Sequence, residues 1–191
     1  MPNSIRAKIM ELSKPVWRIP LADVDLGAEE EAAVLDVLRR GWLAMGEVTA
    51  EFEAEFAALT GARHALAVTN CTAALHLAGL ALGWEPGDEV IVPSLTFVAT
   101  ANAVRYTGAT PIFADIISES DFSLSAEDVA ERITPRTKAI IVVHYAGHAA
   151  DMPAIMALAE RHGLAVVEDV AHAPGADLDG RATGTWGDIG C

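Results

Sequence analysis

Two acidic residues and a histidine stand close together in "VVEDVAHAPGA", residues 166–176. Asp169 ends an apolar run, and His172 follows three residues later. A carboxylate at the end of a buried strand is costly to desolvate unless it has a partner. Asp169 could cap a turn, or it could pair with a bound cationic group while His172 lies on the same side of the site. The Asp-x-x-His spacing alone does not decide between these two interpretations.

The stretch "VTNCTAALHL", residues 68–77, is typical of an anion site at a helix start. A short strand and a polar turn precede the helix, so Thr72 and Ala73 would expose unpaired backbone N–H groups. Those groups and the helix dipole favour a bound anion. An ordinary Thr cap explains the same residues without a ligand.

Phe97, in "PSLTFVAT" (93–100), opens the next predicted helix just beyond a strand. An aromatic residue at such a place usually belongs to the core. If a flat ring is bound near Asp169, however, Phe97 is a candidate surface on which that ring stacks.

Several common ligand motifs are missing from the sequence. It has no GxGxxG and no GxxxxGK[ST], which are the usual dinucleotide and triphosphate loops. His144 and His148 are four residues apart and could suggest a metal. They straddle a predicted strand end and a loop with a glycine, so we expect no metal site.

The composition predicts a globular domain with a sizeable core. Of the 191 residues, 52% are apolar and 21% are charged. No apolar run approaches the roughly 20 residues of a membrane helix, and the start lacks a signal peptide. The net charge of −14 argues against nucleic acid and anionic membranes as partners. The two cysteines, Cys71 and Cys191, suit a reducing compartment, so we predict a cytoplasmic protein.

Amphipathic helical segments alternate with short apolar runs along the chain. Glycines and capping residues bound the predicted helices, which cover residues 28–40, 47–60, 72–82, 96–106, 125–133 and 151–162. The predicted strands cover residues 64–68, 89–92, 110–115, 138–143 and 164–169. This alternation predicts an α/β fold with a mostly parallel sheet and helices on both faces.

Ligands of such sheets bind beyond the carboxyl ends of the strands. Five polar or turn-forming residues fall at predicted strand ends: Asn70, Pro93, Asp115, His144 and Asp169. The order of the elements therefore places Asp169 where a functional site is expected.

In their order, these segments resemble the DegT/StrS family of sugar aminotransferases that depend on pyridoxal 5′-phosphate (PLP). The matching stretches are "GWLAMG" (41–46), "TNCTAALHLAGLALGWEPGDEVIVPSLTFVATANAVRYTGATPIFAD" (69–115), "TPRTKAIIVVHYAGHAADM" (134–152), "HGLAVVEDVAHAPGA" (162–176) and "GTWGDIGC" (184–191). The resemblance implies the type I, aspartate-aminotransferase-like fold of PLP enzymes. It further implies an N-terminal arm over residues 1–20 and an incomplete PLP-binding large domain over 21–191.

The resemblance also implies roles for five residues. Asp169 matches the aspartate that pairs with the pyridine nitrogen of PLP and keeps the ring an electron sink. His172 matches the position near the phenolic oxygen of the cofactor, and Phe97 matches the aromatic residue that stacks on the ring. Thr72 and Ala73 match the helix start that binds the phosphate. The segment 41–46 resembles a loop near the active site of the partner in a homodimer.

The reaction of the family is a two-step amino transfer. Glutamate usually gives its amino group to the cofactor, which then aminates a keto-sugar attached to a nucleoside diphosphate. The resemblance therefore implies these two small molecules as substrates.

The family's Schiff-base lysine lies in a segment that directly follows G-D-x-G-C, and the sequence ends at Cys191. None of the three lysines, Lys8, Lys14 and Lys138, matches that lysine. Two alternatives to an aminotransferase therefore stay open. One is a PLP-dependent sugar dehydratase, which has the same scaffold but a histidine in place of the lysine. The other is a half-enzyme that serves as a subunit without catalysis.

Overall fold

The structure is a computed structural model that describes residues 25–191. The predicted arm, residues 1–20, lies outside these residues together with Lys8 and Lys14, so the domain boundary near residue 20 stays a prediction. The chain forms two compact units, one that ends at Gly46 and one that spans Glu47–Cys191. Each unit is described by itself.

The first unit contains helix α2 (Ala28–Arg40), as the sequence predicts. The Glu30 side chain accepts a hydrogen bond of 2.7 Å from the Gly27 N–H and so caps the helix start. Arginines in the last turn suit the helix dipole. Gly41 ends the helix in the left-handed conformation, with φ 73°.

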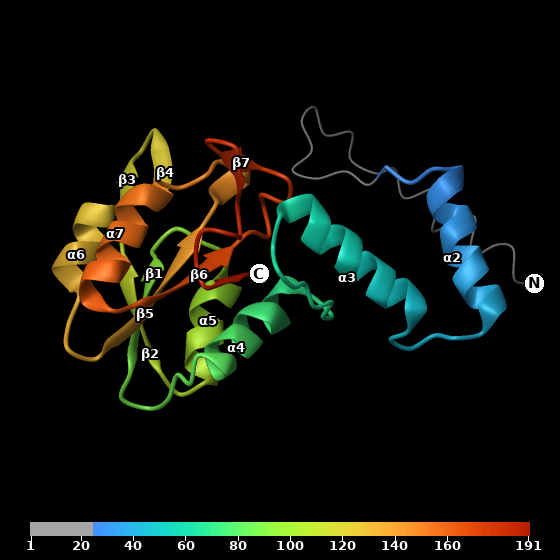
Figure 1. Cartoon of the computed structure of the whole chain (residues 1–191). Coiled ribbons are helices and arrows are strands. Elements are labelled where there is room, and N and C mark those ends of the chain that lie inside the picture. Colours follow the sequence, from blue (N-terminus) through green and yellow to red (C-terminus); the bar gives the residue numbers. More distant parts are fainter. Residues whose placement is uncertain (1–24) are drawn as a thin grey trace, which may run out of the picture. The chain divides into compact units, whose positions relative to one another are not determined.

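The second unit is built on a five-stranded parallel sheet in the order β2-β1-β5-β6-β9 (Figure 1). Its strands are β1 (Glu89–Pro93), β2 (Thr110–Ala114), β5 (Thr137–Val143), β6 (Ala165–Asp169) and β9 (Ile189–Gly190). Its helices are α3 (Glu47–Thr60), α4 (Cys71–Ala81), α5 (Val98–Tyr106), α6 (Ala126–Arg132) and α7 (Met152–His162), with a short 3-10 turn η1 (Tyr145–Gly147).

Both faces of the sheet are covered because successive side chains of a strand point to opposite faces. In β1, Ile91 packs in the core under α6 and α7, whereas Val90 and Val92 pack in the core under α4 and α5. Figure 1 shows these two helix pairs on opposite sides of the sheet. For this reason the middle residues of β1, β5 and β6 are apolar on both faces, as is typical of a parallel sheet covered on both sides.

The strand order reverses between β1 and β5. The chain runs from β1 through α5 to the edge strand β2, then returns across β1 to β5 and continues through α7 to β6. Connections that leave in opposite directions open a crevice at the carboxyl ends of the two central strands. This crevice is the place where a doubly wound sheet binds ligands.

Most predicted elements are confirmed, with small shifts of their ends. The mostly parallel sheet agrees with the sequence analysis, and so do α6 and α7, whose N-cap residues Ser125 and Asp151 stand at the predicted helix starts. Helix α4 begins at Cys71, and Phe97 precedes α5 as its N-cap residue. Between residues 25 and 191, the structure has no helix with the length and apolar character of a membrane span.

The predicted strand over residues 64–68 is wrong. These residues form no strand, because no neighbouring strand in the described part of the chain takes their backbone hydrogen bonds. The Ala67 N–H instead donates to the Glu53 carboxylate at 2.8 Å. Two hairpins were missed by the sequence analysis: β3 (Ile116–Ser118) with β4 (Asp121–Leu124), and β7 (Asp177–Leu178) with β8 (Arg181–Ala182).

Candidate active site

A cavity of about 230 Å³ lies at the carboxyl ends of β5 and β6, next to the point where the strand order reverses. The starts of α4 and α5 and the ends of β5 and β6 form its wall. Four of the five residues that sequence analysis selected line the cavity together: Thr72, Phe97, Asp169 and His172. Ala73 is the next residue of α4 and does not line the cavity.

Asp169 ends β6 as a nearly buried carboxylate, with 5% of its surface exposed. Its Oδ2 accepts a hydrogen bond of 2.8 Å from the Thr100 hydroxyl. Its Oδ1 accepts longer contacts from the Ala171 N–H at 3.3 Å and the Cys71 thiol at 3.6 Å. No basic side chain among residues 25–191 forms an ion pair with Asp169. A buried charge beside a cavity and without a cationic partner suits a cationic group of a ligand.

The two cysteines lie close to this carboxylate. Burial, and then the negative charge of Asp169, raise the pKa of the Cys71 thiol to about 12. The same two causes raise the pKa of Cys191 to about 12. Both thiols are free and stay protonated at neutral pH, so the Cys71 S–H can donate to Asp169.

The start of α4 presents backbone donors to the cavity. Asn70 is the N-cap residue, and its Oδ1 accepts a hydrogen bond of 2.9 Å from the Ala73 N–H. Its carbonyl accepts the Ala74 N–H. Within the described residues, the N–H groups of Cys71 and Thr72 have no such partner and point out of the helix start. The cap of the helix is therefore Asn70 and not Thr72, and Thr72 keeps a free backbone donor.

Phe97 is not a core residue, because 67% of its surface is exposed. It precedes the first turn of α5 and lines the cavity. An exposed ring beside a cavity is available for stacking on a flat ligand.

His172 is held by the turn η1. Its Nδ1 accepts a hydrogen bond of 3.4 Å from the Ala146 N–H, and its ring lies edge-on to Tyr145 at a centroid distance of 5.7 Å. An accepting Nδ1 carries no proton, so in the neutral ring the proton sits on Nε2. Ala146 has the unusual positive φ of 53°, which directs its N–H toward His172.

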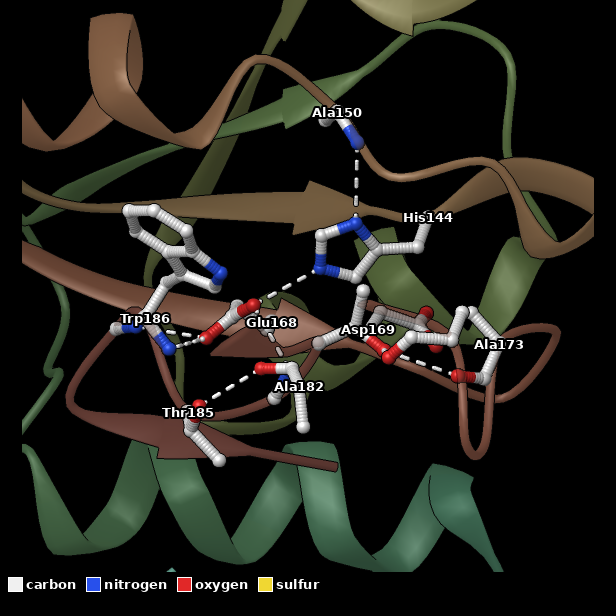
Figure 2. A network of polar contacts seen from close by, with 12 residues as sticks. His144, Ala150, Glu168, Asp169, Ala173, Ala182, Thr185 and Trp186 are labelled. Atoms are coloured by element: carbon white, nitrogen blue, oxygen red, sulfur yellow. Dashed lines mark hydrogen bonds and ion pairs between the residues drawn. The ribbon is translucent and has the colours of Figure 1, made fainter. Parts of the chain in front are cut away.

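Glu168, next to the site, is the centre of a buried hydrogen-bond network (Figure 2). Its Oε2 accepts from His144 Nε2 at 2.9 Å and from the Gly184 N–H at 2.8 Å. Its Oε1 accepts from the N–H groups of Trp186 and Gly187, both at 2.7 Å. Burial acts to raise the pKa of Glu168, but the hydrogen bonds from His144, Gly187 and Gly184 outweigh it, so the pKa lies below its ordinary value.

His144 is fully engaged in this network. Its Nδ1 accepts from the Ala150 N–H at 3.2 Å, so the proton that Nε2 donates to Glu168 is the only one on the neutral ring (Figure 2). His148, by contrast, is exposed. The two histidines that could suggest a metal from their spacing therefore occupy different surroundings.

Lys138 lies far from the cavity. It is the second residue of β5, and its Nζ lies 3.8 Å from the Asp88 carboxylate, with 55% of the side chain exposed. Val143, which pairs with Asp169, ends the same strand five residues later. At ~3.3 Å per residue, the two strand ends are roughly 16 Å apart.

Thr96 and Thr100 are functional candidates that the sequence analysis missed. Thr100 is fully buried and bonded to Asp169, and Thr96 lines the cavity. The signal that could have found them is a pair of threonines around a helix start that directly follows a strand end, since ligands of such sheets bind there.

Comparisons with known proteins identify the family of the chain. A family model described as the DegT/DnrJ/EryC1/StrS aminotransferase family matches residues 24–191. The chain belongs to this family. The spore coat polysaccharide biosynthesis protein SpsC of Bacillus subtilis is 49% identical over 163 residues, which are 85% of the chain and 42% of SpsC.

Two solved structures share the type I fold of the family. One is Spr1654 of Streptococcus pneumoniae, which is assigned as a sugar aminotransferase and was solved in its PLP form. It is 30% identical with a TM-score of 0.86, and the match covers 91% of the chain and 48% of Spr1654. DesI, solved in the presence of its TDP-sugar product, is 40% identical with a TM-score of 0.76, over 84% of the chain and 40% of DesI. The chain thus spans less than half of the length of these members of the DegT/DnrJ/EryC1/StrS family.

Proposed function

We propose that this chain is the PLP-binding part of a sugar aminotransferase. The observation that carries the proposal is Asp169, a nearly buried carboxylate that faces a cavity without a basic partner among residues 25–191. Membership of the DegT/DnrJ/EryC1/StrS family supports the reaction class. PLP supplies an electron sink that stabilises a negative charge at the α-carbon of the amino donor.

The residues of the cavity fit this cofactor. Asp169 would hold the proton on the pyridine nitrogen, because a carboxylate at that point stabilises the charged ring. The phosphate would lie at the start of α4, where Thr72 offers a backbone donor and the helix dipole favours an anion, with Ala73 as the next residue of the helix. Thr72 is the stronger donor of the two, since the Ala73 N–H already bonds Asn70.

Two further side chains would contact the cofactor ring. Phe97 would cover one face of the ring and exclude water from it. His172 would donate the proton on Nε2 to the phenolic oxygen, because Ala146 occupies its Nδ1. A fixed donor at that oxygen favours its ionised form.

For the complete reaction we propose glutamate as the amino donor and a keto-sugar attached to a nucleoside diphosphate as the acceptor. The TDP-sugar product of DesI and the polysaccharide pathway of SpsC support this substrate class. We further propose a homodimer that acts in the cytoplasm without nucleic acid or membrane partners.

The cofactor site is tested with pyridoxamine 5′-phosphate (PMP), the amino form of the cofactor, which needs no lysine for binding. We expect the chain to bind one PMP per site in a calorimetric titration. Asp169→Asn should weaken the affinity by about tenfold or more, because it removes a charged hydrogen bond of about 1.5–3 kcal/mol. Asp177→Asn, an exposed change in β7, is the matched control and should leave the affinity unchanged. Equal affinities of the wild type and Asp169→Asn would contradict the proposal.

A second experiment addresses the lysines. The chain is mixed with PLP and reduced with borohydride, and the modified residue is identified by mass spectrometry. We expect no stoichiometric label on Lys138 because it lies at the opposite end of β5 from the cavity. We also expect no amino transfer from glutamate by these 191 residues alone. One stoichiometric label together with turnover would show that the chain carries its own catalytic amine.

A further inference from the structure

Two threonine hydroxyls connect the cavity wall to Asp169. The Thr100 hydroxyl donates to Asp169 Oδ2 at 2.8 Å, and the Thr96 and Thr100 hydroxyl oxygens are 2.7 Å apart. Thr100 has one hydroxyl proton, and Asp169 receives it. Thr96 must therefore donate to Thr100, which fixes the direction of both hydrogen bonds.

This arrangement distinguishes the two oxygens of Asp169. Oδ2 is bound by Thr100, which is fully buried. Oδ1 has weaker contacts, 3.3 Å to the Ala171 N–H and 3.6 Å to Cys71 Sγ, and both of these residues line the cavity. Oδ1 is thus the oxygen on the cavity side that can accept a proton from a ligand.

The start of α5 carries both the chain of hydroxyls that leads to Asp169 and part of the cavity wall. Thr96 lines the cavity just before the helix, and its hydroxyl contacts that of Thr100 in the first turn of α5. A buried hydroxyl is costly to leave without a partner, so Thr100 and Asp169 hold each other in place.

We propose that Thr100, supported by Thr96, is a positioning residue that fixes the Asp169 carboxylate with Oδ1 toward a cationic ring nitrogen. The identity of that ligand rests on the proposed function. The positioning of Asp169 is a property of the chain without ligand. The positioning role and the proposed function can therefore fail separately.

The first measurement uses the ligand-free chain. Three-bond NMR couplings from the backbone to the Asp169 carboxyl carbon report whether its side chain keeps one rotamer. We expect a single rotamer in the wild type and in Thr100→Ser, which keeps the hydroxyl, and averaged couplings in Thr100→Val. Thr96→Val should average them less, because Thr100 still donates to Asp169. The control is Thr107→Val, whose hydroxyl bonds the Val104 carbonyl at the other end of α5.

Unchanged couplings in both Thr100→Val and Thr96→Val would overturn the proposal. If the Thr100→Val chain does not fold, the couplings of Thr96→Val provide the test. Unchanged couplings in Thr96→Val would then overturn the proposal.

The second measurement is PMP affinity of the same variants. Thr100→Val should bind PMP about tenfold more weakly, the size expected for one hydrogen bond to a charged group. Thr100→Ser should stay within about twofold of the wild type, because the charged hydrogen bond is retained. If the wild type binds no PMP while Thr100→Val still averages the couplings, the proposed function fails and the positioning role stands. If all variants bind PMP as the wild type does, the site binds the ligand without the hydrogen bonds from Thr96 and Thr100, and the proposal is wrong.

Discussion

Replacing Glu168 by glutamine should strongly destabilise the second unit. The carboxylate is fully buried and accepts four hydrogen bonds, two at each oxygen. Glutamine keeps the shape of the side chain but has a single acceptor oxygen. Its NH₂ group must therefore face two N–H donors, whichever way the amide is turned.

The size of the effect follows from the two N–H donors that lose their acceptor. If the NH₂ group faces Trp186 and Gly187, both backbone donors lose their partner. If the NH₂ group faces His144 and Gly184, the Gly184 N–H loses its acceptor. A change of tautomer would let His144 Nε2 accept, but its Nδ1 would then carry the proton and the Ala150 N–H would lose its acceptor. Each buried donor without a partner costs about 1–3 kcal/mol, so Glu168→Gln should lower the free energy of unfolding by about 2–6 kcal/mol.

Urea unfolding at neutral pH measures this loss, with Glu160→Gln in the last turn of α7 as the control. Glu160 is exposed, and its change should stay within about 0.5 kcal/mol of the wild type. If Glu168→Gln also stays within that range, the four hydrogen bonds do not stabilise the fold and the reasoning is refuted.

The loss should also depend on pH. The pKa of Glu168 in the folded chain lies below the ordinary value of 4.5, so the unfolded chain binds this proton more tightly. The stabilisation is therefore present above the unfolded pKa and is lost as the pH falls through the folded pKa. The difference between wild type and Glu168→Gln should be constant near neutrality and shrink in acid below the ordinary pKa.

Three further predictions concern neighbouring parts of the second unit. Gly187→Ala should lower the free energy of unfolding in urea by about 1–3 kcal/mol, because a Cβ there would lie 2.5 Å from the Val166 carbonyl oxygen. Wild-type stability of this variant would contradict the close approach. Ala146→Gly should raise the free energy of unfolding by about 0.5–1 kcal/mol by relieving the positive φ of 53°, and a loss of stability would show that the turn is not strained. Cys71 and Cys191, whose pKa values are raised to about 12, should react with iodoacetamide at pH 8 far more slowly in the folded chain than in urea; equal rates would show that the thiols are not buried beside Asp169.

The secondary structure was largely predictable because its signals are local. Asp151 caps α7 and Gly163 ends it in the left-handed conformation, and both residues are visible in the sequence. The apolar run before Asp169 predicted a buried strand of a parallel sheet, and β6 is one, since it lies between β5 and β9. Local patterns determine where such elements begin and end.

Pairing across the chain was harder to predict. Residues 64–68 have the composition of a strand, but a strand also needs a neighbour, and the described residues supply none. The roles of Glu168 and Thr100 depend on contacts with residues 16–24 and 69 positions away, respectively. No local sequence pattern around Glu168 or Thr100 predicts those partners. The end of a predicted strand and the resemblance to a family both led to Asp169, but the groups that hold it required the structure.

The cavity beside Asp169 should bind a PLP-type cofactor in one orientation, and a crystal structure of the chain with PMP would show it. We expect the pyridine nitrogen within hydrogen-bond distance of the Asp169 carboxylate and the phosphate in contact with the Thr72 N–H at the start of α4. PMP bound elsewhere, with the start of α4 occupied by the Asn70 cap alone, would rule out this cofactor site.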